Sequence, residues 1–239
     1  MRKKSLPMPD DDYQPLMERI GYEFKDLTLL RQATTHRSYL NEHPDWPHGH
    51  NERLEFLGDA VLELIVTEEL YAQHPQETEG QMTNWRAALV NANILSDIAA
   101  KFGLNDHMLL SRGESRDTGR ARQYILANAF EAVVGAMYLD GGYEPCKTFI
   151  ERFVLVHLPD IIANKTYRDA KSLLQEEAQE RIGVTPTYQV MEEWGPDHAR
   201  QFRIGVYLGR ELAGEGQGSS KQDAQQAAAE DALKNKDWK

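Results

Sequence analysis

Residues 51–70 read NERLEFLGDAVLELIVTEEL, and this stretch holds three carboxylates, Glu52, Glu55 and Asp59. In a helix, steps of three and four residues bring these side chains within about 60° of one face. Most surrounding residues are apolar, a pattern typical of a buried helix, so we expect Glu55 and Asp59 at the edge of a core. Like charges clustered there cost roughly 4 kcal/mol per pair at 4 Å, and their oxygens suit Mg²⁺ or Mn²⁺. An ordinary helix with a solvent-facing acidic stripe explains the spacing equally well.

A second apolar stretch, residues 125–139 (ILANAFEAVVGAMYL), carries Asn128 and Glu131 three residues apart. Gly58 in the first stretch and Gly135 in the second are small enough to let two helix backbones approach closely. The alternative is a buried polar pair that is satisfied by hydrogen bonds. If the two helices pack together, four side chains form one oxygen-rich site: Glu55, Asp59, Asn128 and Glu131.

Both stretches resemble the ribonuclease III family. NERLEFLGD (residues 51–59) is similar to the family signature, and ILANAFEA with GAMYLD (residues 125–140) resembles its second metal-binding helix. THRSY (residues 35–39) also matches, although its histidine reads better as a hydrogen-bonded structural residue than as a general base. The resemblance implies that Asp59 and Glu131 are the catalytic residues. The further residues that it assigns are Glu55 and Asn128 as metal ligands, with Glu52 and Glu79 as outer or second-metal acids.

Beyond Pro159 the hydrophobic period changes. The expected elements are a helix over 169–181, strands over 187–193, 201–208 and 211–216, and an alanine-rich helix over 220–235. This α-β-β-β-α order resembles a double-stranded-RNA-binding domain. The resemblance implies that the RNA-binding residues are Gln175, Gln179, His198, Ser220 and Lys221. Family members usually carry two or three basic residues at 221–223, where this chain reads Lys-Gln-Asp, so we expect reduced affinity.

The predicted architecture is an all-α endonuclease domain over residues 13–157, a linker over 158–167, and a small α+β double-stranded-RNA-binding domain over 168–237. The net charge of −11 argues against a generally adhesive polycation, so RNA binding must rest on local basic groups and be sensitive to salt. Four arginines in a Gly/Ser-containing stretch are available for phosphate, with a solvated loop as the alternative: Arg112, Arg116, Arg120 and Arg122.

The single cysteine, Cys146, excludes an intrachain disulfide framework and a cysteine-cluster zinc site. It fits a reducing cytoplasm. No run of 18 apolar residues occurs, and the N-terminus lacks the apolar core of a signal peptide. We therefore expect a cytoplasmic protein without membrane association.

The resemblance to ribonuclease III implies a Mg²⁺-dependent endoribonuclease, with Mn²⁺ as a possible substitute. It would hydrolyse double-stranded RNA, leave 5′-phosphate and 3′-hydroxyl ends, and process rRNA or mRNA. The family resemblance further implies a homodimer, and the apolar Phe56 and Leu57 fit a dimer interface. One alternative is a double-stranded-RNA-binding protein with weak or no cleavage, because Asn128 stands where the family usually has Asp. The other is an acidic helical protein whose carboxylates simply bind divalent ions.

Overall fold

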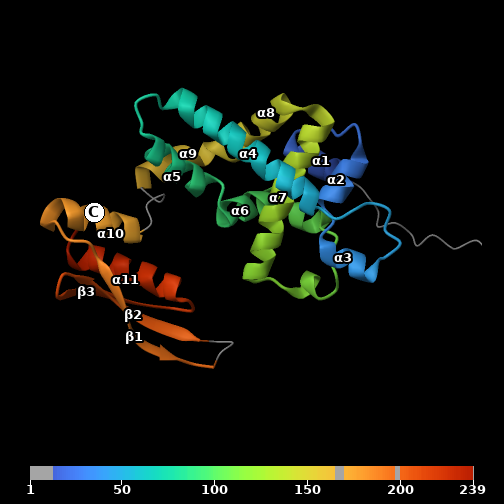
Figure 1. Cartoon of the computed structure of the whole chain (residues 1–239). Helices are drawn as coiled ribbons and strands as arrows, with labels where there is room; N and C mark the ends of the chain where they lie inside the picture. The colour runs from blue at the N-terminus through green and yellow to red at the C-terminus, as the bar shows by residue number, and fades with distance from the viewer. Residues whose placement is uncertain (1–12, 165–169, 197–199, 239) are drawn as a thin grey trace, which may run out of the picture. The chain divides into compact units, whose positions relative to one another are not determined.

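The structure, a computed structural model, describes residues 13–164, 170–196 and 200–238 (Figure 1). The chain divides into two compact units, Met1–Asn164 and Lys165–Lys239. The first is helical, and the second has the order helix, three strands, helix. The predicted fold class, an all-α domain followed by a small α-β-β-β-α domain, is confirmed.

The first unit is built around two helices of 22 residues each, α4 and α7, which cross at its centre (Figure 1). Its α-helices are α1 (Gln14–Ile20), α2 (Leu27–Ala33), α3 (Arg37–Glu42), α4 (Glu52–Gln73), α5 (Glu79–Leu89), α6 (Ala92–Lys101), α7 (Arg120–Gly141), α8 (Tyr143–Phe153) and α9 (Leu158–Asn164). Its 3₁₀ turns are η1 (Leu104–His107), η2 (Glu114–Arg116) and η3 (Leu155–His157). Helix α7 is the core of this unit, because eleven of its residues are buried.

Two glycines set the distance between α4 and α7. A Cβ atom on Gly58 would lie 1.7 Å from the carbonyl oxygen of Glu131, and one on Gly135 would lie 2.2 Å from that of Leu54. No side chain fits in either place, so the backbones touch directly at the crossing. The sequence prediction of a close approach at these glycines is therefore confirmed.

The linker predicted over 158–167 is wrong in its first part, because Leu158–Asn164 forms helix α9. Leu158 and Ile161 are buried, which anchors this helix in the first unit. Pro159 suggested a break in the chain, but it occupies the first turn of α9. A proline is tolerated there, since the N–H that it lacks would have no partner within the helix. Residues 165–169 lie outside the described part of the chain.

In the second unit, α10 (Ala170–Ile182) and α11 (Lys221–Asn235) pack on a three-stranded antiparallel sheet of order β1-β2-β3. Its strands are β1 (Thr187–Trp194), β2 (Gln201–Leu208) and β3 (Glu211–Gly218). Four alternating residues of β2 are buried: Phe202, Ile204, Val206 and Leu208.

Strand β3 lies unusually close to α11 because every second residue at its end is glycine. A Cβ atom on Gly214, Gly216 or Gly218 would lie 2.1–2.6 Å from backbone atoms of α11. The facing positions of α11 are alanines spaced by four residues, Ala224, Ala228 and Ala232. Glycine on the strand and alanine on the helix thus match in register, and this contact fixes where α11 begins.

Candidate active site

The α4–α7 crossing brings the predicted catalytic side chains together. Glu55 and Asp59 project from α4, and Asn128 and Glu131 from α7. Asp59 is exposed, whereas Glu55 and Glu131 are half-buried. Because Gly58 contacts the backbone of Glu131 itself, the glycine contact and the acidic cluster occupy the same place on the two helices.

Burial and like charge disfavour ionisation in this cluster. Burial first, and then the charges of Asp59, Glu55 and Glu63, raise the pKa of Glu131 to about 8. Burial also raises the pKa of Glu55, with Glu52 and Asp59 adding to the effect. The carboxylates therefore interact strongly, and a bound cation would offset their mutual repulsion.

Asn128 is part of the cluster through a hydrogen bond with Glu55, which lowers the pKa of Glu55 against the effect of burial. The four residues predicted from the sequence to form one site are thus neighbours in the structure.

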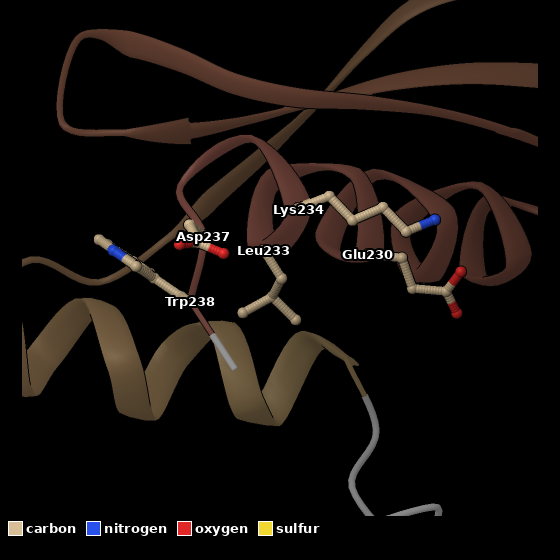
Figure 2. A pocket seen from close by; sticks show the side chains of 5 residues that line it. All are labelled: Glu230, Leu233, Lys234, Asp237 and Trp238. Carbon is tan, nitrogen blue, oxygen red and sulfur yellow. The ribbon is translucent and has the colours of Figure 1, made fainter.

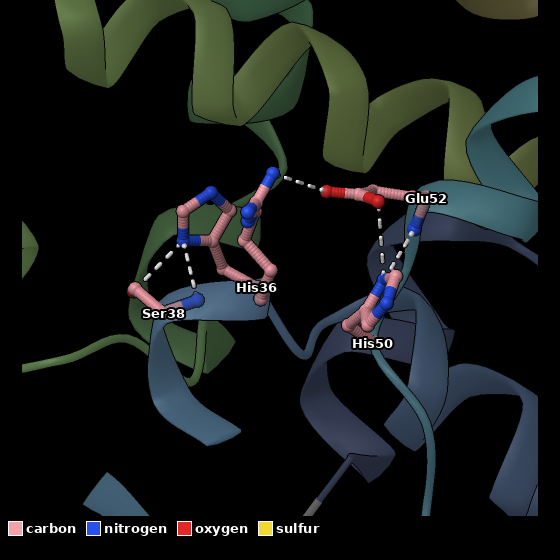
Figure 3. A network of polar contacts seen from close by, with 5 residues as sticks. His36, Ser38, His50 and Glu52 are labelled. Atoms are coloured by element: carbon pink, nitrogen blue, oxygen red, sulfur yellow. Dashed lines mark hydrogen bonds and ion pairs between the residues drawn. The ribbon is translucent and has the colours of Figure 1, made fainter. Parts of the chain in front are cut away.

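Glu52 lies at the start of α4, and its backbone N–H donates to Nδ1 of His50 (Figure 3). Arg37 donates from Nη1 to Glu52 Oε1 over 3.3 Å, and His50 Nδ1 lies 3.7 Å from Glu52 Oε2. His36 is structural: its ring accepts a hydrogen bond from the backbone N–H of Ser38 and caps α3. The THRSY segment therefore positions Glu52 rather than supplying a general base.

Two further acids lie outside the group of four. Glu79 lies at the start of α5, where its carboxylate accepts a hydrogen bond from Thr83, and it is not among the charges that raise the pKa of Glu131 or Glu55. Glu63, which the sequence reasoning missed, does act on Glu131. The available signal was its position four residues after Asp59, on the same face of α4.

The oxygen donors at the crossing are of the kind that Mg²⁺ and Mn²⁺ prefer. Within residues 13–164, 170–196 and 200–238, no group of three His, Cys, Asp or Glu side chains lies close enough to hold a metal ion. The donor set at the crossing includes the amide of Asn128, and its carboxylates repel one another. Since a cation would offset this repulsion, the chemistry of these oxygen donors suits a divalent ion.

In the second unit, the predicted RNA-binding residues lie on two helices. Gln175 and Gln179 are exposed on α10, one turn apart. Ser220 caps α11 by accepting a hydrogen bond from the N–H of Asp223 over 3.0 Å. Lys221 is exposed in the first turn of α11, with Nζ 5.6 Å from the centre of the Phe202 ring. His198 lies outside the described residues.

Comparison with known proteins agrees with this geometry. Residues 26–158 match the family described as Ribonuclease-III-like, and residues 170–236 match the double-stranded RNA binding motif. The chain is 42% identical over 230 residues to Ribonuclease 3 of Bdellovibrio bacteriovorus, covering 96% of this chain and 98% of that protein. It is 45% identical over 220 residues to Ribonuclease 3 of Enterococcus faecalis, covering 92% and 95%. The chain belongs to the ribonuclease III family.

A solved structure of a ribonuclease III nuclease domain, from Campylobacter jejuni, is 39% identical to the chain, with a TM-score of 0.56. The match covers 62% of this chain and 99% of the Campylobacter jejuni chain. This likeness supports the interpretation of the first unit as a ribonuclease III nuclease domain.

A separate cavity in the second unit, of about 410 Å³, lies at the end of α11 (Figure 2). Its residues are Glu230, Leu233, Lys234, Asp237 and Trp238. The N–H of Trp238 donates to the carbonyl of Leu233, and that of Asp237 to the carbonyl of Lys234, with Asp237 at φ 54°. This is a left-handed helix cap with an apolar contact between Trp238 and Leu233. The cavity contains none of the predicted RNA-binding residues, so we interpret it as part of the cap of α11.

Proposed function

We propose that this member of the ribonuclease III family is an endoribonuclease that hydrolyses double-stranded RNA with the help of Mg²⁺, for which Mn²⁺ can substitute. The products would carry 5′-phosphate and 3′-hydroxyl ends, as in rRNA or mRNA processing. The observation that supports this most is the carboxylate cluster at the α4–α7 crossing, where Asp59, Glu55 and Glu63 all act on Glu131. Such a cluster is costly to the fold and is explained by a cationic ligand.

Each residue of the proposed site has its own role. Asp59 and Glu131 would hold the cation from opposite helices, with Glu55 and Asn128 as the remaining ligands. When bound, the cation neutralises charge on the phosphodiester and activates a water molecule. The hydrogen bond between Asn128 and Glu55 links α7 to α4 at the proposed site. Arg37 would hold Glu52 beside the site as an outer acid, and Glu79 stays a proposed outer acid.

The test of this function is incubation of a fully paired RNA duplex, and of either single strand alone, with the full chain and Mg²⁺. We expect only the duplex to be cut, and the products to be ligatable at 5′-phosphate ends without kinase treatment. Equal cleavage of the single strand, or 5′-hydroxyl products, would contradict the proposal.

We further propose that the second unit captures RNA with Lys221 gripping a phosphate. Lys221→Ala should weaken duplex binding evenly across sequences and reduce the slope of log K against log salt by about one. The reason is that Lys221 is the one basic residue in the first turn of α11. Fluorescence anisotropy in a salt series measures it, with Lys234→Gln at the other end of the helix as the control. An unchanged slope would place the phosphate contacts elsewhere.

Asn128 separates the enzyme from the alternative of a binding protein on the same scaffold. It carries no charge, so the site has one negative charge fewer than an aspartate would give, and the attraction for the cation should be weaker. Asn128→Asp should lower the Mg²⁺ concentration for half-maximal cleavage, with little change in RNA affinity measured without metal. An unchanged metal requirement would show that Asn128 is not a ligand. If only the Asp variant cleaves, the binding-protein alternative is correct.

We also propose a homodimer formed through the start of α4. Phe56 is 83% exposed and Leu139 is 55% exposed, although both are large and apolar. Both line a cavity of about 610 Å³ together with Leu57. The solved structure of the Campylobacter jejuni nuclease domain is described as showing flexibility in a region involved in dimer formation. An exposed apolar surface of this kind is typical of an interface.

Phe56→Asp should therefore shift the chain from dimer to monomer in sedimentation experiments, because it places a charge in an apolar contact. Tyr71→Asp, at an exposed aromatic on the far end of α4, is the matched control and should leave the dimer intact. A wild-type chain that sediments as a monomer at micromolar concentration would contradict the dimer.

None of the helices among the described residues is long and apolar enough to cross a membrane. We retain the cytoplasm as the proposed location. It is supported by the single cysteine, Cys146, which is a free, buried thiol.

A further inference from the structure

The face of α7 that carries the active-site residues continues toward the start of the helix. At 100° per residue, Arg120, Tyr124, Asn128 and Glu131 lie within about 80° of one another around the helix axis. Eleven residues separate Arg120 from Glu131, which is about 16 Å along the helix. The same face therefore presents the carboxylate cluster in its middle and an arginine–tyrosine pair at one end.

The pair is exposed and is not used by the fold. Tyr124 is 49% exposed, and the Arg120 guanidinium lies 5.9 Å from the centre of its ring. In the described part of the chain Arg120 makes no ion pair. Arg116, four positions earlier in the sequence, is also exposed and makes no ion pair with any described residue. Nearby Glu114 and Asp117 act on the charge of Arg122.

Helix stability does not explain a basic residue at this position. The first turn of α7 contains no acidic residue, and cations there oppose the helix dipole. Arg122 has a structural explanation, since its Nε donates to Asn105 Oδ1 over 2.8 Å and ties α7 to η1. Arg120 has no comparable contact. Its place is explained if it binds an anion supplied by another molecule.

We propose that Arg120 and Tyr124 bind the backbone of the same RNA strand that is cut at the α4–α7 crossing. This inference rests on the proposed function and names the part of the substrate that these residues contact. A separation of about 16 Å is several times the spacing of neighbouring phosphates along a strand, so Arg120 would meet a phosphate several nucleotides from the cleaved bond. The guanidinium of Arg120 pairs with a phosphate of that strand, and the ring of Tyr124 packs on the adjoining ribose.

The experiment measures duplex binding to the full chain in a salt series without divalent cation, so that no cleavage occurs. Arg120→Gln is expected to reduce the slope of log K against log salt by about one, and Arg120→Lys to restore it. Tyr124→Ala should weaken binding several-fold with the slope unchanged, because it removes a neutral contact. Lys101→Gln on α6 and Tyr71→Ala on α4 are exposed matched controls in the same unit, and neither should alter binding.

An unchanged slope for Arg120→Gln, or an equal loss for Lys101→Gln, would overturn the proposal. With Mg²⁺ added, Arg120→Gln should raise KM while leaving kcat near that of the wild type, since the residue is remote from the reacting phosphate. A loss of kcat alone would also overturn it. Because binding is read without cleavage, a wild-type chain that never cleaves would contradict the proposed function and leave the Arg120 result interpretable.

Discussion

Asp59→Asn is expected to reduce cleavage of double-stranded RNA by about 10³-fold or more while leaving RNA binding nearly intact. The amide is close in shape to the carboxylate but carries no charge, so it removes cation binding with little disturbance of α4. Asp59 is exposed, and the fold does not depend on its charge. Glu131→Gln should have an effect of the same size, because Glu131 supplies the corresponding carboxylate from α7. Single-turnover cleavage and binding in chelator measure the two quantities separately.

Asp97→Asn on α6 is the matched control, since Asp97 is also exposed and should leave cleavage unchanged. Substantial Mg²⁺-dependent cleavage by either active-site variant would place the chemistry elsewhere. Loss of RNA binding in step with cleavage would show that the substitution had disturbed the fold.

Gly58→Ala is expected to destabilise the nuclease unit by about 3 kcal/mol or more and to abolish cleavage. The added methyl group would lie 1.7 Å from the carbonyl oxygen of Glu131, so α4 and α7 must separate. Neither partner in that clash is a flexible side chain. The same displacement moves Glu131 away from Asp59, so activity falls even in molecules that remain folded. Urea unfolding measures the loss of stability.

Gly80→Ala is the matched control within the same unit. Gly80 lies in helix α5, and a Cβ atom there would have no neighbour within 4 Å. It should leave stability unchanged or raise it by about 0.5–1 kcal/mol, because alanine has the higher helix propensity. If Gly58→Ala were as stable as wild type, the direct contact of the two backbones would be wrong.

The sequence was sufficient to predict that the two long helices approach each other closely. Gly58 and Gly135 each lie against the backbone of the other helix. The proposed site residues of each helix are three or four positions apart, which places them on one helix face. The elements of the second unit were also predicted from the sequence, because β2 has alternating buried residues and α11 has buried alanines at a helical period. Periodic patterns identify such elements well when the element is long.

What the sequence did not reveal depends on neighbours that lie far apart along the chain. Arg37 reaches Glu52 only because α3 lies near the start of α4. The apolar pattern around Phe56 is typical of a buried helix, and only the family resemblance indicated a dimer interface there; Phe56 is 83% exposed. A periodic pattern cannot distinguish an apolar face that packs in its own core from one available to a partner. Likewise Pro159 reads as a break, although the first turn of a helix accepts it.

The most direct measurement is the single-turnover rate at which the unaltered chain cuts a fully paired RNA duplex as Mg²⁺ is titrated from a chelated solution. The rate should be zero in chelator and rise to saturation with Mg²⁺, with Mn²⁺ able to replace it. Glu131→Gln should remain at the baseline over the whole titration. Cleavage in chelator, or no cleavage at any concentration of either metal, would contradict the assignment of the α4–α7 carboxylates as a metal-dependent nuclease site.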